Sequence, residues 1–178
     1  MVSFQDIQTA YYIVAAVGIF VASANYLRVS IEDSKKKRIE TTNNLMKTLT
    51  SKEGIHEYFE LLSMEWKDYD DFEKKYGSDF NFESAITRFH IWTTYDILGH
   101  QLEKGLVDEE TIYDAWGIFT LWTWDKFESI LDEHRRRYVG RDAYRGWEYL
   151  SGAMRRIKKR REPEYVVPET YAKYIPEM

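Results

Sequence analysis

The chain of 178 residues has no cysteine and only three prolines, and both shortages limit what it can be. Without cysteine there is no disulfide framework, no thiolate metal site and no cysteine nucleophile, a composition that suits a reducing compartment. The prolines, at positions 163, 168 and 176, all follow residue 162. The preceding sequence is therefore free of the residue that most strongly breaks helices.

Sequence motifs for common catalytic sites are also missing. There is no Gly-x-x-x-x-Gly-Lys-[Ser/Thr] loop, no Gly-x-Gly-x-x-Gly turn and no Gly-x-Ser-x-Gly elbow. Glu53 and His56 form a single Glu-x-x-His unit, whereas a ferritin-like di-iron bundle needs two. Asp96 and His100 are four residues apart, a spacing more typical of a surface ion pair than of a metal site. We therefore assign no catalytic residue, expect no metal or other cofactor, and lean against an enzyme.

Charge is absent from residues 7–27, a run of apolar and small residues near the N-terminus. As a helix, this run would extend about 30 Å, the thickness of the hydrocarbon core of a bilayer. Tyr11, Tyr12 and Tyr26 lie where interfacial aromatic residues are found in membrane spans. We expect residues 1–27 to be an N-terminal segment with a single transmembrane helix.

Basic residues follow the apolar run and predict its orientation. Membrane-flanking positive charges favour the cytoplasmic side, which places the N-terminus outside and the C-terminus in the cytoplasm. The flanking residues are Arg28, Lys35, Lys36, Lys37 and Arg38.

Two other interpretations of this run remain open. Ala22-Ser23-Ala24 is similar to a signal-peptide cleavage site, although the residues before the run include no basic side chain. A buried core helix is the second interpretation, disfavoured by the four consecutive basic residues at 35–38. If the helix does span a membrane, a stripe of small residues ending in an amide would allow a second helix to approach closely. This candidate helix contact consists of Ala15, Gly18, Ala22 and Asn25.

The rest of the sequence predicts an all-α fold. We expect a helical stalk over 28–50, a helical cytoplasmic domain over 51–161 and an extended, proline-containing tail over 162–178. Within the domain, Thr50 and Glu53 have capping-box spacing, and a short acidic helix ends at Gly77. Asp79 or Asn81 caps a helix that reaches about Lys104 and stops at Gly105. Asp108 starts another helix that ends at Gly140, and a last helix covers about 142–161.

Hydrophobic spacing predicts which face of each helix enters the core. The helix after Thr50 presents Ile55, Tyr58, Phe59, Leu62 and Trp66. The next long helix presents Phe82, Ile86, Phe89, Trp92 and Leu98. The helix after Asp108 presents Ile112, Trp116, Phe119, Thr123, Phe127 and Ile130.

Charge is distributed unevenly along the domain. Residues 51–133 are strongly acidic, whereas residues 134–161 are strongly basic. A basic cluster at the end of the last helix, composed of Arg155, Arg156, Lys158, Lys159, Arg160 and Arg161, exceeds what compensation of the helix dipole requires. We expect it to contact anionic lipid or an acidic protein surface. A nucleic-acid partner is not expected, because the acidic section would repel a phosphate backbone.

The aromatic and acidic segment Met64-Glu65-Trp66-Lys67-Asp68-Tyr69-Asp70-Asp71-Phe72, continuing through Lys75-Tyr76-Gly77, gives the chain a family resemblance. With this segment and the Ala-Tyr-Tyr-Ile sequence of the apolar run, the chain resembles a largely archaeal family of short proteins. The resemblance covers most of residues 8–160. The resemblance implies a membrane anchor and an all-helical cytoplasmic domain of unknown function. It supplies no catalytic residue.

These observations favour a membrane-anchored, non-enzymatic interaction protein. It would be an accessory subunit of a membrane complex or a self-associating scaffold, with membrane lipid and a protein partner or a second copy as its partners. The alternative is a membrane-bound enzyme or sensor with a pocket in the helical domain. That pocket would be lined by Trp92, Asp96, His100, Trp116 and Trp122.

Overall fold

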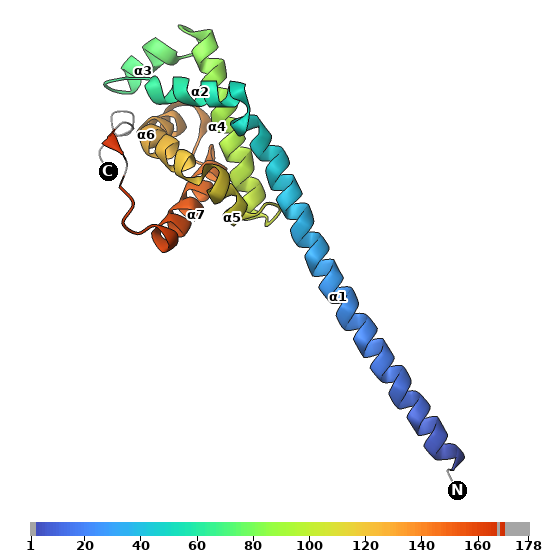
Figure 1. Cartoon of the computed structure of the whole chain (residues 1–178). Helices are drawn as coiled ribbons and strands as arrows, with labels where there is room; N and C mark the ends of the chain where they lie inside the picture. Colours follow the sequence, from blue (N-terminus) through green and yellow to red (C-terminus); the bar gives the residue numbers. More distant parts are fainter. Residues whose placement is uncertain (1–2, 167, 170–178) are drawn as a thin grey trace. The chain divides into compact units, whose positions relative to one another are not determined.

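The computed structural model describes residues 3–166 and 168–169, and its regular elements there are all helices, which confirms the expected all-α class (Figure 1). Residues 167 and 170–178 of the expected extended tail, Pro176 among them, lie outside the described part. Just after residue 161 the backbone turns, with Tyr165 N donating to the Glu162 carbonyl. The elements are α1 (Phe4–Thr50), α2 (Lys52–Ser63), α3 (Tyr69–Tyr76), α4 (Phe82–Glu103), α5 (Glu109–Ile112), the π-helical turn η1 (Tyr113–Gly117), α6 (Ile118–His134), the π-helical turn η2 (Arg135–Val139) and α7 (Arg145–Arg161).

The chain divides into two compact units, Met1–Arg38 and Ile39–Met178. The first unit is the early part of α1, which runs without a break from Phe4 to Thr50. It contains a stretch that is long and apolar enough to cross a membrane, and none of that stretch is buried. The first unit therefore has no core of its own.

The second unit includes the last turns of α1, which differs from the stalk expected over 28–50. Thr42, Met46 and Leu49 are buried in the helical domain. Thr42 Oγ1 accepts a hydrogen bond from the backbone N–H of Asp108 at 2.8 Å. The domain thus begins near residue 39, because these side chains supply part of its core.

Local capping residues fix the starts of α2, α3, α4 and α5. Asp68, Asn81 and Asp108 accept hydrogen bonds from the first turns of α3, α4 and α5. The N-cap of α2 is Ser51, whose Oγ accepts from Gly54 N at 2.9 Å, so the expected start at Thr50 is wrong by one residue. Gly105 follows α4 with a φ of 67°, and Gly140 follows η2 with a φ of 81°, conformations that favour glycine.

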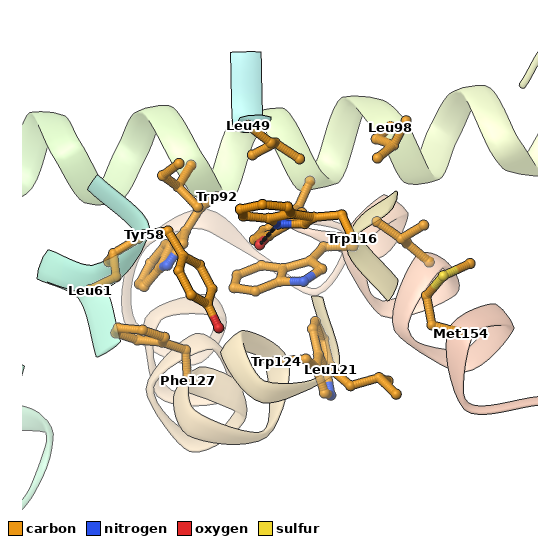
Figure 2. Packing of buried hydrophobic residues seen from close by; sticks show 14 of the residues in the cluster. Leu49, Tyr58, Leu61, Trp92, Leu98, Trp116, Leu121, Trp124, Phe127 and Met154 are labelled. Carbon is orange, nitrogen blue, oxygen red and sulfur yellow. Dashed lines mark hydrogen bonds between the residues drawn. The ribbon is translucent and has the colours of Figure 1, made fainter. Parts of the chain in front are cut away.

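Aromatic side chains from α2, α4, η1, α6 and α7 fill the core (Figure 2). The ring of Tyr58 meets that of Trp116 edge to face, with centroids 5.4 Å apart. Trp116 Nε1 donates to the hydroxyl of Tyr95 at 2.9 Å. The predicted face after Asp108 is largely confirmed, although Phe119 is only half-buried. In α2 the core side chains are Tyr58, Leu61 and Leu62, whereas Ile55 and Phe59 are exposed, contrary to expectation.

The segment after Asp108 is not one uniform α-helix, because a π-helical turn separates α5 from α6. In this turn the ring of Tyr113 packs against the backbone of Gly117. A Cβ atom at Gly117 would lie 2.5 Å from that ring, which is closer than atoms can pack. A side chain at this position would therefore have to displace the ring of Tyr113.

α4 and α7 approach very closely where Gly99 faces Gly146. A Cβ on Gly99 would lie 1.7 Å from the carbonyl oxygen of Gly146. Beside this contact, Asp96 Oδ1 accepts a hydrogen bond from the backbone N–H of Trp147 at 3.2 Å. α7 begins at Arg145, later than the expected residue 142, and the residue before it, Tyr144, adopts a φ of 59°. Its first turn is thus capped from α4 rather than by its own sequence.

Candidate functional site

An apolar groove of about 630 Å³ runs along the outer face of α4. Its α4 wall contains Phe82, Ile86, Phe89 and Ile97, with exposed fractions of 65%, 48%, 64% and 46%. Three of these residues, Phe82, Ile86 and Phe89, were expected in the core. That prediction is wrong, because α4 buries a different face, formed by Ala85, Arg88, Ile91, Trp92, Tyr95, Leu98, Gly99 and Leu102.

The sequence does contain a pattern that indicates this groove, but assigning only one face of α4 to the core hides it. α4 has apolar side chains on two sides, whereas a helix on the surface of a domain usually has one apolar stripe. One apolar side packs against α7 and the core. The other lies at the surface, and contiguous exposed apolar residues of this kind often mark a binding surface.

The groove lining also contains His134, the last residue of α6, with Val139 and Tyr144 from the segment that leads to α7. This segment is irregular. His134 is followed at once by the π-helical turn η2, and Tyr144 has a left-handed backbone conformation. Both features are uncommon and recur at functional sites, so this part of the lining is built from conformations that cost stability.

Arg88 is the charged residue that α4 contributes to the groove lining. Its exposed fraction is only 7%. Its guanidinium carbon lies 4.9 Å from the centre of the Phe72 ring and 4.8 Å from that of Trp92. The nearest carboxylate, on Glu73, is 3.9 Å away. Burial lowers the pKa of Arg88, partly offset by Glu73. The groove therefore has a positive charge beneath its apolar wall.

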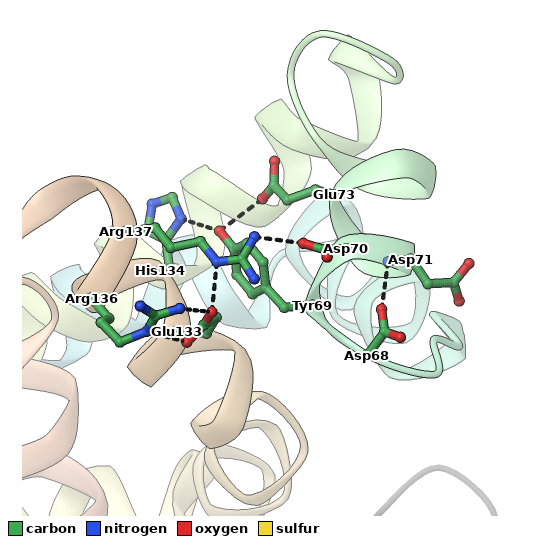
Figure 3. Close-up of polar contacts among 9 residues, drawn as sticks. All are labelled: Asp68, Tyr69, Asp70, Asp71, Glu73, Glu133, His134, Arg136 and Arg137. Carbon is green, nitrogen blue, oxygen red and sulfur yellow. Dashed lines mark hydrogen bonds and ion pairs between the residues drawn. The ribbon is translucent and has the colours of Figure 1, made fainter.

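A polar network joins α3 to the end of α6 beside the groove (Figure 3). The Tyr69 hydroxyl lies 2.9 Å from His134 Nδ1 and donates to Glu73 Oε1 at 3.1 Å. Arg137 pairs with Asp70 at 2.5 Å and with Glu133 at 2.6 Å. Burial, and then Glu73, raise the pKa of Tyr69, and the arginine pairs hold the pKa of Glu133 at about 2. The groove wall at His134 is thus fixed by α3.

Acidification should destabilise the domain through His134. Burial, helped by the positive charge of Arg88, lowers the pKa of this imidazole in the folded state. The unfolded chain then binds the proton more readily, so stability is complete above about pH 6.5 and falls as the pH drops below that value. We expect His134→Gln to reduce the loss of unfolding free energy between pH 7.5 and 5.5, measured by urea denaturation.

The control for this prediction is His56→Gln, which changes an exposed histidine outside the groove. It should leave the pH dependence as in the parent. Equal slopes for the parent and the His134 variant would show that protonation of His134 does not affect folding.

The basic cluster at the end of α7 is partly neutralised within the domain. Arg155 pairs with Asp125, Arg160 with Glu110, and Arg161 with both Glu110 and Asp114. Part of the positive charge is therefore balanced inside the domain, which leaves less of it for an external partner than the sequence indicates. Lys158 lies over the ring of Tyr165, and with Lys159 it borders a hollow of about 280 Å³. Arg156, Lys158 and Lys159 have no carboxylate partner within the described part of the chain.

Loss of the charge at Arg155 should destabilise the domain. The Asp125 side chain is mostly buried, and burial raises its pKa while Arg155 opposes that rise. Arg155→Met would leave this carboxylate without its partner, at a cost of about 1–3 kcal/mol. Urea denaturation at neutral pH measures the loss. Arg156→Met, one residue along the same helix, is the control and should change stability by less than about 0.5 kcal/mol.

The three tryptophans expected in the alternative pocket line three different hollows. Trp92 borders the groove, whereas Trp116 and Trp122 border two other hollows. Asp96 caps α7 and lies 3.7 Å from His100. Within the described residues, no three histidine, aspartate or glutamate side chains gather as metal ligands would.

The predicted anchor residues all lie on α1. Ala15, Gly18, Ala22 and Asn25 lie at helical spacing along it, and an added Cβ at Gly18 would have no neighbour within 4 Å. The membrane-flanking residues, Arg28, Lys35, Lys36, Lys37 and Arg38, are exposed, and Arg28 pairs with Glu32 at 3.0 Å.

Comparison with known proteins identifies a family. Residues 12–154 match the family described as Domain of unknown function (DUF4760). No curated protein and no solved structure matches the chain. The matched region contains every residue that lines the groove, whereas the basic cluster at 155–161 follows it. Because the match covers most of its length, the chain belongs to the DUF4760 family.

Proposed function

We propose that this chain is a membrane-anchored interaction protein, with one transmembrane helix and a cytoplasmic helical domain that binds a partner. The observation that carries the proposal is an uncharged, apolar stretch of α1 of which nothing is buried, in a chain whose second unit has a core of its own. Exposed apolar surface of this length is unfavourable in water and favourable in a bilayer.

The orientation follows from the basic residues after the span. A reporter enzyme fused after Met178 should be active only in the cytoplasm, because the flanking basic residues lie on the C-terminal side of the span. The matched variant replaces Lys35, Lys36, Lys37 and Arg38 with glutamine and should weaken this preference. Activity of the parent fusion on the outer face, or recovery of the chain without membrane, would contradict the proposal.

The domain offers two surfaces for a partner, the apolar groove and the three cations of the basic cluster that lack carboxylate partners. The groove exposes apolar side chains that a water-soluble domain would ordinarily bury. These three cations, Arg156, Lys158 and Lys159, are suited to anionic lipid head groups or an acidic protein surface.

Charge reversal tests the role of the basic cluster. The full chain in neutral-lipid nanodiscs should bind vesicles that contain anionic lipid, and changing Arg156, Lys158 and Lys159 to glutamate should weaken that binding strongly. Each basic residue near an anionic surface is worth about 1 kcal/mol. Changing the exposed residues Lys52, Lys67 and Lys74 to glutamate is the control, because it alters the net charge equally. If both triple variants bind alike, the cluster has no specific role in the contact.

A further inference from the structure

Two buried nitrogen atoms beside the groove lack hydrogen-bond partners among the residues described. They are Nε of Arg88 and Nε1 of Trp92, and both residues line the groove. Each nitrogen carries a hydrogen and can only donate. Buried donors without partners are rare in folded proteins, because leaving them unpaired is unfavourable. The guanidinium carbon of Arg88 lies 4.8 Å from the centre of the Trp92 ring, so an acceptor group at this point of the lining would lie near both side chains.

Besides its contacts with the rings of Phe72 and Trp92, Arg88 has polar contacts that are longer than charge-assisted hydrogen bonds usually are. Its Nη2 donates to the carbonyl of Tyr76 at 3.5 Å, and its Nη1 lies 3.9 Å from Glu73. Charge-assisted hydrogen bonds are about 2.7–2.9 Å long. Glu73 is also engaged by the hydroxyl of Tyr69. A planar carboxylate has two acceptor oxygens and matches the fork of a guanidinium.

Most of the groove surface beyond these donors is apolar. The wall from Phe82 to Ile97 extends for about 22 Å along α4, comparable with an extended long-chain acyl group. The groove volume of about 630 Å³ lies within the range of small-molecule sites, roughly 300–1,000 Å³. A ligand that fits this site has one anionic end and a long apolar body.

We propose that the groove binds a long-chain fatty acid, with its carboxylate at Arg88 and Trp92 and its hydrocarbon chain along the outer face of α4. A partner helix would cover the apolar wall and would need an acidic side chain at one point to reach the donors, whereas a fatty acid carries the carboxylate and the apolar body in one molecule. The proposal concerns the groove alone and does not require α1 to cross a membrane. It assigns one class of ligand, long-chain fatty acids, to the groove on the helical domain.

Photolabelling of the full chain tests this proposal. The chain in neutral-lipid nanodiscs is irradiated with a long-chain fatty acid that carries a diazirine on its hydrocarbon chain, and the labelled peptides are mapped by mass spectrometry. We expect label within residues 82–97. Unlabelled fatty acid should displace it, whereas the methyl ester of the same acid, which lacks the charge, and acetate, which lacks the chain, should not.

Matched variants separate the groove from general apolar surface. Ile86→Glu places a charge in the wall and should reduce labelling of residues 82–97 about tenfold. Leu106→Glu changes an equally exposed side chain outside the groove, 49% against 48%, and should leave labelling unchanged. Arg88→Gln should abolish the preference for the acid over its methyl ester, with folding checked by circular dichroism.

Four results would overturn the proposal. Label confined to α1 would report only contact with bilayer lipid, and equal displacement by acid and methyl ester would show that no carboxylate is recognised. Labelling unaffected by Ile86→Glu would place the ligand elsewhere. Loss of a dimer in the Ile86 variant, without any fatty-acid label on α4, would make the groove a protein contact.

Discussion

Replacing Gly99 with alanine should severely destabilise the helical domain. The added Cβ would lie 1.7 Å from the carbonyl oxygen of Gly146, and backbone at that distance cannot move aside as a flexible side chain can. α4 and α7 would have to separate, which would also disturb the hydrogen bond from Trp147 N to Asp96. We expect a loss of about 3 kcal/mol or more, at the upper end for overpacking.

Thermal and urea denaturation measure this loss, and Gly152→Ala is its control. Gly152 lies on α7, where a new Cβ would approach no atom closer than 3.7 Å, the flexible end of Arg156. Because alanine favours helix over glycine by up to about 1 kcal/mol, this second variant should be neutral or stabilising. If the two variants changed the free energy of unfolding by similar amounts, α4 and α7 would not be in close contact at Gly99.

Trp147→Ala should be nearly as damaging, for the opposite reason, because it empties space rather than overfilling it. The Trp147 side chain is fully buried, and its ring lies 5.1 Å from Tyr95, 5.3 Å from Trp124 and 6.1 Å from Trp92. Truncation of a large buried aromatic costs about 3–5 kcal/mol.

Tyr149→Ala on the same helix is the comparison for the tryptophan variant. Its side chain is exposed, so the change in unfolding free energy should stay within about 0.5 kcal/mol. A tryptophan variant that unfolds at the same urea concentration as the parent would show that the centre of the core has been misplaced.

Helix ends were largely predictable from the sequence because they depend on neighbouring residues. Asp68, Asn81 and Asp108 each accept from a backbone N–H three residues later, and Gly105 and Gly140 relieve the strain of a positive φ. The start of α7 was not predictable in this way. Tyr144 has no side-chain cap of its own, and the acceptor comes from Asp96, more than forty residues earlier.

The candidate site was harder to predict than the fold. Periodicity identifies apolar faces but does not say which of two faces a domain covers, so Phe82, Ile86 and Phe89 were assigned to the core. The charge pattern predicts the basic cluster as a contact surface, and that role stays a prediction. The pattern did not show that Glu110, Asp114 and Asp125 neutralise part of the cluster, because those pairings depend on how α5, η1 and α6 pack against α7.

The contact between α4 and α7 also has consequences for the order in which the domain opens. Because a carboxylate of α4 caps α7 and their backbones meet at Gly99 and Gly146, neither helix keeps its native surroundings if the other leaves. Their amide hydrogens should therefore exchange with solvent deuterium together, as one cooperative unit. Exposed ion pairs such as Arg137 with Asp70 make up part of the attachment of α3, so α3 should exchange earlier, and salt should hasten its release.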